Sequence, residues 1–203
     1  MNKKITTEAD NIKIFFEFLK NITIIPQNEL DKLSMISKTK YIKKGDYFLR
    51  QGNKTHSLAF VIKGLFRITY LTEEGKEFTK SFLDKNDFLV AYSSLLQDKE
   101  SSFSIEALEN STIIEIDYHQ WINMFEDEIS WNKLLITILN KAFCKKEERE
   151  KEFLLYDAQT RYENFLKNNL HLLSRIKQNT LASYLGITPV ALSNLKNNFI
   201  KLL

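Results

Sequence analysis

The chain has 203 residues, 43% of them hydrophobic, which is enough for one large or two modest folded domains. Its 27% charged residues, five glycines and two prolines exclude a disordered or fibrous protein. The sequence shows neither a signal peptide nor an apolar run long enough to cross a membrane, so we expect a cytoplasmic protein. Because Cys144 is the only cysteine, the sequence excludes an intramolecular disulfide and a cysteine-bound zinc or iron–sulfur site, and we predict no metal.

Residues 9–37 have the spacing of short helices. Apolar residues recur at intervals of three and four, as at Ile12, Phe16 and Leu19, and Pro26 interrupts the pattern before it resumes. We therefore expect two short helices before the first strand.

From Thr39 to Asp117 the pattern changes to short strand-like segments separated by tight bends. Glycine suits such bends because it adopts positive φ without steric cost. Four of the five glycines of the chain lie at them: Gly45, Gly52, Gly64 and Gly75. The sequence therefore predicts an all-β barrel or roll for this part of the chain.

After Asp117 the apolar spacing is again helical, and one long helix over residues 128–156 accounts for it. A helix of this length is more than a small domain covers, so we expect its apolar stripe to pair with the same helix of a second subunit. Packing against the roll of the same chain is the alternative. The residues expected in the dimer helix are Leu135, Ile138, Ala142 and Phe143.

Positive charge is concentrated near the C-terminus. Residues 158–203 hold six lysine and arginine residues against Glu163 alone and so carry a net charge of +5, whereas residues 1–157 carry −2. A basic segment of this kind favours a nucleic-acid surface, although lysine-rich solvated faces are also common. The sequence pattern within the segment has to decide between them.

Residues 174–198 have the pattern of a helix-turn-helix. Apolar residues at 181–185 form one face of a first short helix, and Gly186 permits the turn that follows it. Thr188 suits the N-cap of a second helix and Pro189 its first position. Side chains outside the apolar faces suit base edges and phosphates. The candidate DNA-binding residues are Arg175, Lys177, Gln178, Asn179, Thr188, Pro189, Val190, Ser193, Asn194, Lys196 and Asn197.

Nearly the whole chain resembles the Crp/Fnr family of transcriptional regulators. In the roll the resemblance rests on the strings Lys44-Gly45-Asp46-Tyr47-Phe48, Gln51-Gly52, Phe60-Val61-Ile62-Lys63-Gly64 and Gly75-Lys76-Glu77. Near the C-terminus it rests on Leu181-Ala182-Ser183-Tyr184-Leu185-Gly186-Ile187-Thr188-Pro189.

The resemblance implies an α+β protein with three parts. An N-terminal double-stranded β-helix, of the jelly-roll or β-roll type found in cyclic-nucleotide-binding domains, would form a sensor over residues 1–127. A dimerisation helix over 128–156 and a helix-turn-helix DNA-binding domain with a short wing over 157–203 would follow. The partners implied are double-stranded DNA, a second copy of the chain and RNA polymerase, with no membrane.

The roll departs from relatives that bind cyclic AMP. Those relatives have a Gly-Glu pair for the ribose where this sequence has Val90-Ala91, and an arginine pair for the phosphate where it has Ser101-Ser102. A cyclic phosphate would meet no cation there, and desolvating an unpaired charge is costly. We therefore predict no cofactor and do not expect cyclic AMP as effector. The candidate effector pocket is Val90, Ala91, Tyr92, Ser93, Ser101 and Ser102.

Two readings of that pocket stay open. It takes another small molecule, or it is filled as core by Tyr92, Leu95, Leu96 and Phe103. Haem is not expected, because His56 and His119 are isolated.

The recognition helix departs from the family as well. Val190 and Asn194 stand where relatives commonly carry a glutamate and an arginine that read bases. Losing the arginine removes the bidentate contact to guanine and predicts a different operator, and Asn194 and Asn197 become candidates for adenine edges.

The sequence leaves one rival class of function, a small-molecule-binding or protein-interaction module whose helix-turn-helix is degenerate. An enzyme is not expected, because the strands offer His56 beside scattered lysines and no acid–base pair or metal-ligand set.

Overall fold

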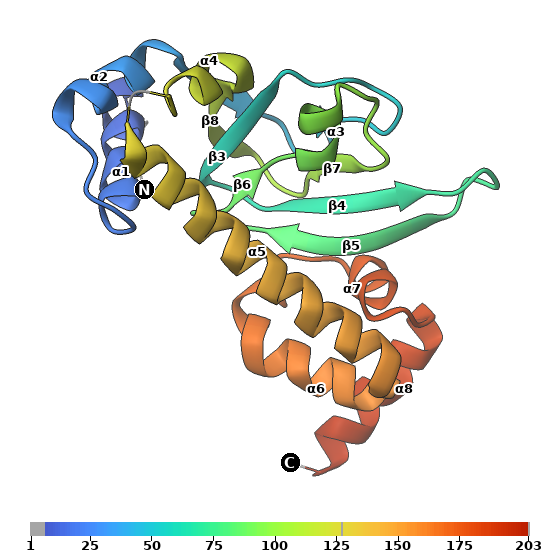
Figure 1. Ribbon diagram of the computed structural model, residues 1–203. Helices are drawn as coiled ribbons and strands as arrows, with labels where there is room; N and C mark the ends of the chain where they lie inside the picture. The colour runs from blue at the N-terminus through green and yellow to red at the C-terminus, as the bar shows by residue number, and fades with distance from the viewer. Residues whose placement is uncertain (1–6, 127, 203) are drawn as a thin grey trace. The chain divides into compact units, whose positions relative to one another are not determined.

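The computed structural model describes residues 7–126 and 128–202, with side chains as far as Asn197 (Figure 1). The chain forms two compact units. The first consists of Met1–Ile68 and Phe82–Asn140, and the second of Thr69–Ser81 and Lys141–Leu203. The boundary at Asn140 falls within a long helix, Ile129–Leu155. The hairpin segment Thr69–Ser81 belongs to the second unit. The expected three-part division at residues 127 and 156 stays a prediction.

The first unit begins with the two helices that the sequence predicts, α1 (Glu8–Lys20) and α2 (Gln27–Met35). Thr7 and Asp10 form a capping box at the start of α1: the Asp10 N–H donates to Thr7 Oγ1 across 3.2 Å, and the Thr7 N–H donates to Asp10 Oδ2 across 3.0 Å. Two amides that would otherwise lack a partner are satisfied there, which fixes the residue at which α1 begins.

Two four-stranded sheets form the roll, which confirms the predicted fold class. Their strand orders are β1-β8-β3-β6 and β2-β7-β4-β5. The short helix α3 (Tyr92–Gln97) lies between strands β6 and β7. The strands are β1 (Ser37–Ile42), β2 (Tyr47–Leu49), β3 (Ser57–Lys63), β4 (Phe66–Leu71), β5 (Glu77–Leu83), β6 (Phe88–Leu89), β7 (Ser104–Ala107) and β8 (Ser111–Asp117).

The roll has a tightly filled apolar core. Phe66, Leu89, Ile105 and Ile113 have no exposed surface and belong to one cluster that draws on both sheets. A second cluster joins β3 and β8 to α1, α2, α4 (Tyr118–Asn123) and the start of α5 (Ile129–Leu155). The first turns of α5 are therefore part of the core of the first unit.

Trp131 of α5 anchors that second cluster. Its side chain has no exposed surface, and its Nε1–H donates to Glu29 Oε2 across 3.0 Å. Glu29 is buried on α2 and also lies 2.7 Å from Lys32 Nζ. These two contacts hold the pKa of the Glu29 carboxyl below its ordinary value, the Lys32 hydrogen bond contributing most.

This arrangement predicts a pH dependence. A carboxyl with a lowered pKa stabilises the fold above its ordinary value of 4.5, and that stabilisation is lost as the pH falls through the lowered value. The difference in unfolding free energy between the wild type and Glu29→Gln is expected to be constant near neutral pH and to shrink below 4.5. Urea denaturation along a pH series measures it. Glu17→Gln, at an exposed carboxylate of α1, is the control; an equal pH response of both variants would contradict the assignment.

The second unit contains the remaining helices, which Figure 1 shows beside the C-terminal half of α5. They are α6 (Ala158–Asn169), the 3₁₀ turn η1 (Leu170–Leu172), α7 (Gln178–Leu185) and α8 (Pro189–Leu202). The pair α7 and α8 is the predicted helix-turn-helix. Helix α8 extends to Leu202 and no strand follows it among the described residues, so the expected short wing is not found in them. No helix within the described residues is long and apolar enough to span a membrane.

Candidate nucleic-acid interface

The turn between α7 and α8 is held by buried apolar contacts and by one glycine. Leu181, Ala182, Leu185 and Leu192 are at most 1% exposed, so the facing surfaces of the two helices are closed. Gly186 ends α7 with φ of 68°, in the left-handed region that glycine adopts without strain. The next amide, that of Ile187, donates back to the Ala182 carbonyl across 3.0 Å. The angle between the helices is thereby fixed by local sequence.

The start of α8 is capped as the sequence predicts. Thr188 Oγ1 accepts a hydrogen bond from the Ala191 N–H across 3.1 Å, and Pro189 takes the first helical position. The Thr188 hydroxyl is consequently engaged with its own helix. Of the candidate residues, Thr188 is thus placed to support the helix.

The outward face of α8 brings several candidate residues together. Val190 is 70% exposed, and Asn194 and Asn197 are exposed as well. Ser193 and Lys196 are half-buried. Pro189 is exposed at the first turn of the same helix.

The N-terminal end of α7 presents a second group. Lys177, Gln178 and Asn179 are exposed, whereas Arg175 is half-buried just before them. Lys177 occupies the N-cap without a side-chain hydrogen bond to the helix. The first amides of α7 therefore receive no cap from this side chain, and Lys177 adds a positive charge beside them.

Arg149 of α5 holds the last turn of α7, a role that no sequence pattern pointed to. Its guanidinium lies over the rings of Phe153, at 4.1 Å, and Tyr184, at 3.8 Å. It also donates to Glu152 Oε2 across 2.8 Å and to the Tyr184 carbonyl oxygen. A cation at the C-terminal end of a helix is favoured by the helix dipole.

Arg161 of α6 completes this support. Its Nε–H donates to the Leu185 carbonyl across 3.0 Å, and its Nη1 donates to the Tyr156 carbonyl across 2.6 Å. The two arginines therefore satisfy the last carbonyls of α7, the first helix of the helix-turn-helix, from two different helices.

The tip of the β4–β5 hairpin, residues 69–81, contacts α7 within the same unit. Ser183 Oγ accepts a hydrogen bond from the Thr79 N–H across 2.8 Å and lies 3.4 Å from the Glu77 carbonyl oxygen, to which it donates. Thr79 is buried at this contact. No local sequence pattern relates residues this far apart, so this contact could not be predicted from the sequence.

The candidate effector pocket is a mixture of core and surface. Ala91 and Ser101 are buried, and Val90 and Tyr92 are half-buried. Ser93 and Ser102 are exposed. The Ser101 hydroxyl donates to the Phe103 carbonyl across 2.8 Å, so it is already satisfied within the protein.

These residues do not fit a cyclic nucleotide. Arg67 is the arginine of the roll strands, and it is paired with Glu106 across 2.5 Å, both side chains being about 15% exposed. Lys99 is exposed on the loop after α3. An anionic phosphate beside Ala91 and Ser101 would therefore be desolvated without a cation.

The alternative hypothesis, that core side chains fill the candidate effector pocket, agrees with three of the four residues it names. Leu95 and Phe103 are buried and Tyr92 is half-buried, but Leu96 is 57% exposed and was wrongly expected in the core. Ser94 and Leu95 share the buried face of α3, and because successive helix residues turn by about 100°, Leu96 falls outside that face.

The expected dimer residues of α5 divide into two pairs. Leu135 and Ile138 pack partly against the core of their own unit, while Ala142 and Phe143 are exposed. The apolar stripe of the sequence thus covers this chain's own core over its first turns, the alternative that the sequence left open. Pairing of the helix with a second copy stays a prediction.

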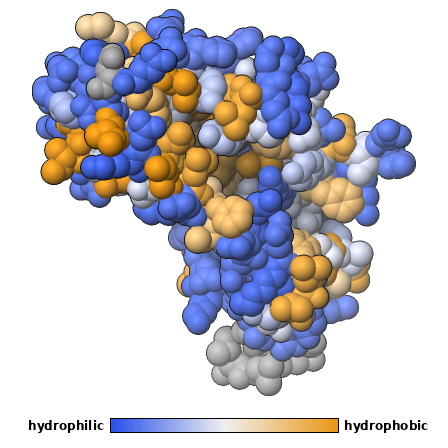
Figure 2. Space-filling model, viewed as in Figure 1, coloured by the Kyte–Doolittle hydropathy of each residue, from blue (hydrophilic) through white to orange (hydrophobic). Residues whose placement is uncertain are grey.

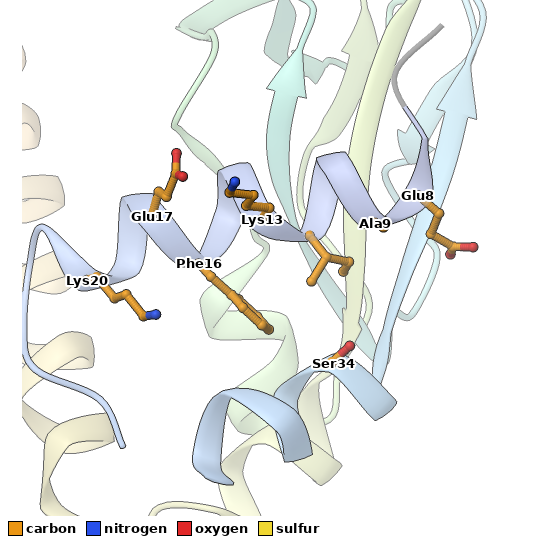
Figure 3. Close-up of a pocket in the computed structure, with 8 residues that line it drawn as sticks. Glu8, Ala9, Lys13, Phe16, Glu17, Lys20 and Ser34 are labelled. Atoms are coloured by element: carbon orange, nitrogen blue, oxygen red, sulfur yellow. The ribbon is translucent and has the colours of Figure 1, made fainter. Parts of the chain in front are cut away.

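A surface cavity of about 460 Å³ lies along α1, with Ser34 of α2 at its edge (Figure 3). Ile12 and Phe16 form its apolar floor, and lysines and glutamates of both signs surround it. In Figure 2 hydrophobic atoms also gather over the α1 and α2 end of the molecule, where Ile24 and Met35 are 89% and 81% exposed. None of the candidate effector residues lines this cavity.

Comparison with known proteins agrees with this architecture. The model of the cyclic nucleotide-binding domain matches residues 39–128. The fumarate and nitrate reduction regulatory protein of Vibrio cholerae is 28% identical over 190 residues, which cover 86% of this chain and 74% of that protein.

Two solved structures have the same fold. FixK2 from Bradyrhizobium japonicum matches with a TM-score of 0.73 at 13% identity, covering 82% of this chain and 86% of FixK2. A protein described as a transcriptional regulator of the Crp/Fnr family, from Eubacterium rectale, matches with a TM-score of 0.70 at 18% identity, covering 86% and 83%. The domain match, the curated relatives and the shared fold together make the chain similar to regulators of the Crp/Fnr family.

Proposed function

We propose that the chain is a homodimeric, DNA-binding transcriptional regulator that does not respond to cyclic AMP. The observation that carries the proposal is the helix-turn-helix itself: a closed, capped α7–α8 pair with a polar outward face and an exposed lysine at the start of α7. Helices of this kind place their N-terminal residues in the major groove. The chain would act in the cytoplasm and would not be an enzyme.

Exposed residues of α5 support the dimer. Ile129, Ile136 and Phe143 recur every seven residues along this helix and are 69%, 57% and 59% exposed. A seven-residue apolar repeat is the spacing of a coiled coil, in which two copies cover each other's stripe. Two recognition helices would then bind half-sites about 34 Å apart, one turn of DNA. In the proposed division of the chain, the long helix would follow the sensor roll, residues 1–127, and precede the DNA-binding part, residues 157–203.

The test of DNA binding is a titration of the full-length chain against fragmented genomic DNA at several salt concentrations. Retention at low salt that weakens steeply as salt rises is expected, because lysine contacts release counterions from DNA phosphates. If no fragment is retained at low salt, the proposed function is wrong and the rival function, a ligand- or protein-binding module, replaces it. Calorimetry with cyclic AMP tests the second part of the proposal, and micromolar binding would contradict it.

Lys177→Ala gives a sharper prediction. Removing one phosphate contact is expected to weaken binding to all DNA sequences equally and to make the slope of log affinity against log salt shallower by about 1. Lys85→Ala removes the same charge from an exposed turn of the roll and is the matched control. An unchanged slope in Lys177→Ala would show that this lysine does not contact DNA.

RNA polymerase is the protein partner that a regulator of this kind would need. We propose it on that functional ground. The proposal is tested by transcription from a retained promoter fragment with purified polymerase, in the presence and absence of the chain.

A further inference from the structure

We infer that the outward face of α8 selects A·T base pairs, Asn194 and Asn197 pairing with adenine and Val190 contacting the methyl group of thymine. The inference rests on the proposed function and goes beyond it, because it assigns which base pairs the operator half-site must contain.

The geometry of α8 brings these three side chains to one face. Residues 190, 194 and 197 are spaced by four and three, so they lie within one stripe of the helix. The stripe is opposite Leu192, which is fully buried against α7. Val190, in the first turn, is 70% exposed, and both asparagines are exposed, so all three can reach a base edge.

The other candidates of α8 are less able to read bases. The Thr188 hydroxyl accepts the Ala191 N–H and caps the helix. Ser193 and Lys196 are half-buried at the margins of the stripe. Base reading therefore falls on the three exposed side chains.

The chemistry of the face determines the base. No charged side chain lies in the stripe over residues 189–197, the part of α8 whose side chains the structure describes, so this part offers neither the arginine fork that suits guanine nor a carboxylate that suits cytosine. An asparagine amide matches the N6 donor and N7 acceptor of adenine. The valine side chain cannot form hydrogen bonds. It can make an apolar contact with the thymine methyl group, the one apolar group in the major groove.

The first experiment is selection from a random DNA library by the full-length chain. Half-sites with adenine and thymine at the contacted positions are expected from the wild type. Asn194→Arg is expected to change the preferred base from adenine to guanine at one position, by about tenfold or more. Asn168→Arg, which adds the same charge at an exposed residue of α6, is the control and should raise affinity without changing the selected base.

The second experiment tests Val190 on the selected half-site. Replacing the contacted thymine with uracil removes only the methyl group and is expected to weaken wild-type binding about fourfold, the effect of exposing one buried methyl group. Val190→Ala should bind the thymine and uracil sites equally. Replacing the contacted adenine with 7-deazaadenine tests Asn194 in the same way, with Asn194→Ala as the insensitive partner.

The outcomes separate this inference from the proposed function. If the wild type retains no DNA at low salt, both fail. If it retains DNA but enriches guanine, or if Asn194→Arg and Val190→Ala leave the base preferences unchanged, the function stands and the A·T assignment is wrong. Circular dichroism of each variant verifies that the helices are intact, so an altered preference cannot arise from unfolding.

Discussion

Arg149→Ala is expected to lower the unfolding free energy of the second unit by about 3 kcal/mol, because it removes one partner of a mostly buried ion pair. The side chains of Arg149 and Glu152 are 16% and 13% exposed, so the carboxylate left behind is poorly solvated. The variant also removes the Arg149 hydrogen bond to the Tyr184 carbonyl and uncovers the rings of Phe153 and Tyr184. Thermal denaturation and hydrogen exchange of the α7 amides measure the loss.

A second variant on the same helix provides the control. Lys146 pairs with Glu150 across 3.5 Å, but both side chains are at least 60% exposed, so Lys146→Ala is expected to change stability by at most about 0.5 kcal/mol. Arg149→Lys keeps the positive charge but lacks the planar guanidinium, so its loss of stability should lie between those of Arg149→Ala and Lys146→Ala. Equal stabilities of Arg149→Ala and Lys146→Ala would contradict the role assigned to the arginine. Since α7 orients α8, DNA affinity is expected to fall with the loss of stability in Arg149→Ala only.

Gly64→Ala is expected to destabilise the roll by about 3–5 kcal/mol, through backbone strain and overpacking together. Gly64 has φ of 134° between β3 and β4, a conformation that other residues rarely adopt. An added Cβ would lie 2.0 Å from Ser111 Oγ and 2.9 Å from Ser111 Cα, so side-chain rotation alone cannot relieve the clash. A fall in melting temperature of about 10 °C or more is expected for a protein of this size.

Gly75→Ala separates the two causes. Gly75 has φ of 79°, but nothing lies within 4 Å of an added Cβ, so only the backbone cost of about 1 kcal/mol applies. If Gly64→Ala were no more destabilising than Gly75→Ala, the close approach of the chain at Ser111 would not be a constraint on the roll. Calorimetry of both variants beside the wild type decides this.

The helix-turn-helix could be predicted from sequence because its determinants are local. Gly186 ends one helix, Thr188 caps the next, and each acts on residues within four positions of itself. The strands and their glycine bends were predictable for the same reason. Helix α3 was not separated from the strands around it, since six residues are too few for a helical period to be recognised.

Contacts between distant segments could not be predicted. Trp131 and Glu29 are 102 residues apart, and Thr79 and Ser183 are 104 apart, yet each pair is joined by a hydrogen bond. An apolar stripe on a helix indicates that the stripe is buried, but it does not tell whether the same chain or a second subunit buries it. For this reason Leu135 was assigned to a dimer interface from the sequence, whereas it packs partly on the core of its own unit.

The placement of the hairpin tip has a consequence for dissecting the chain. The polypeptide passes between the two units three times, after Ile68, after Ser81 and after Asn140. A single proteolytic cut in α5 would therefore not release either unit whole: residues 69–81 would stay with the N-terminal fragment, and their Thr79 N–H would lose the Ser183 hydroxyl that accepts it. The two units are thus interlaced along the chain, and a truncation at Asn140 leaves the second unit without residues 69–81, which belong to it.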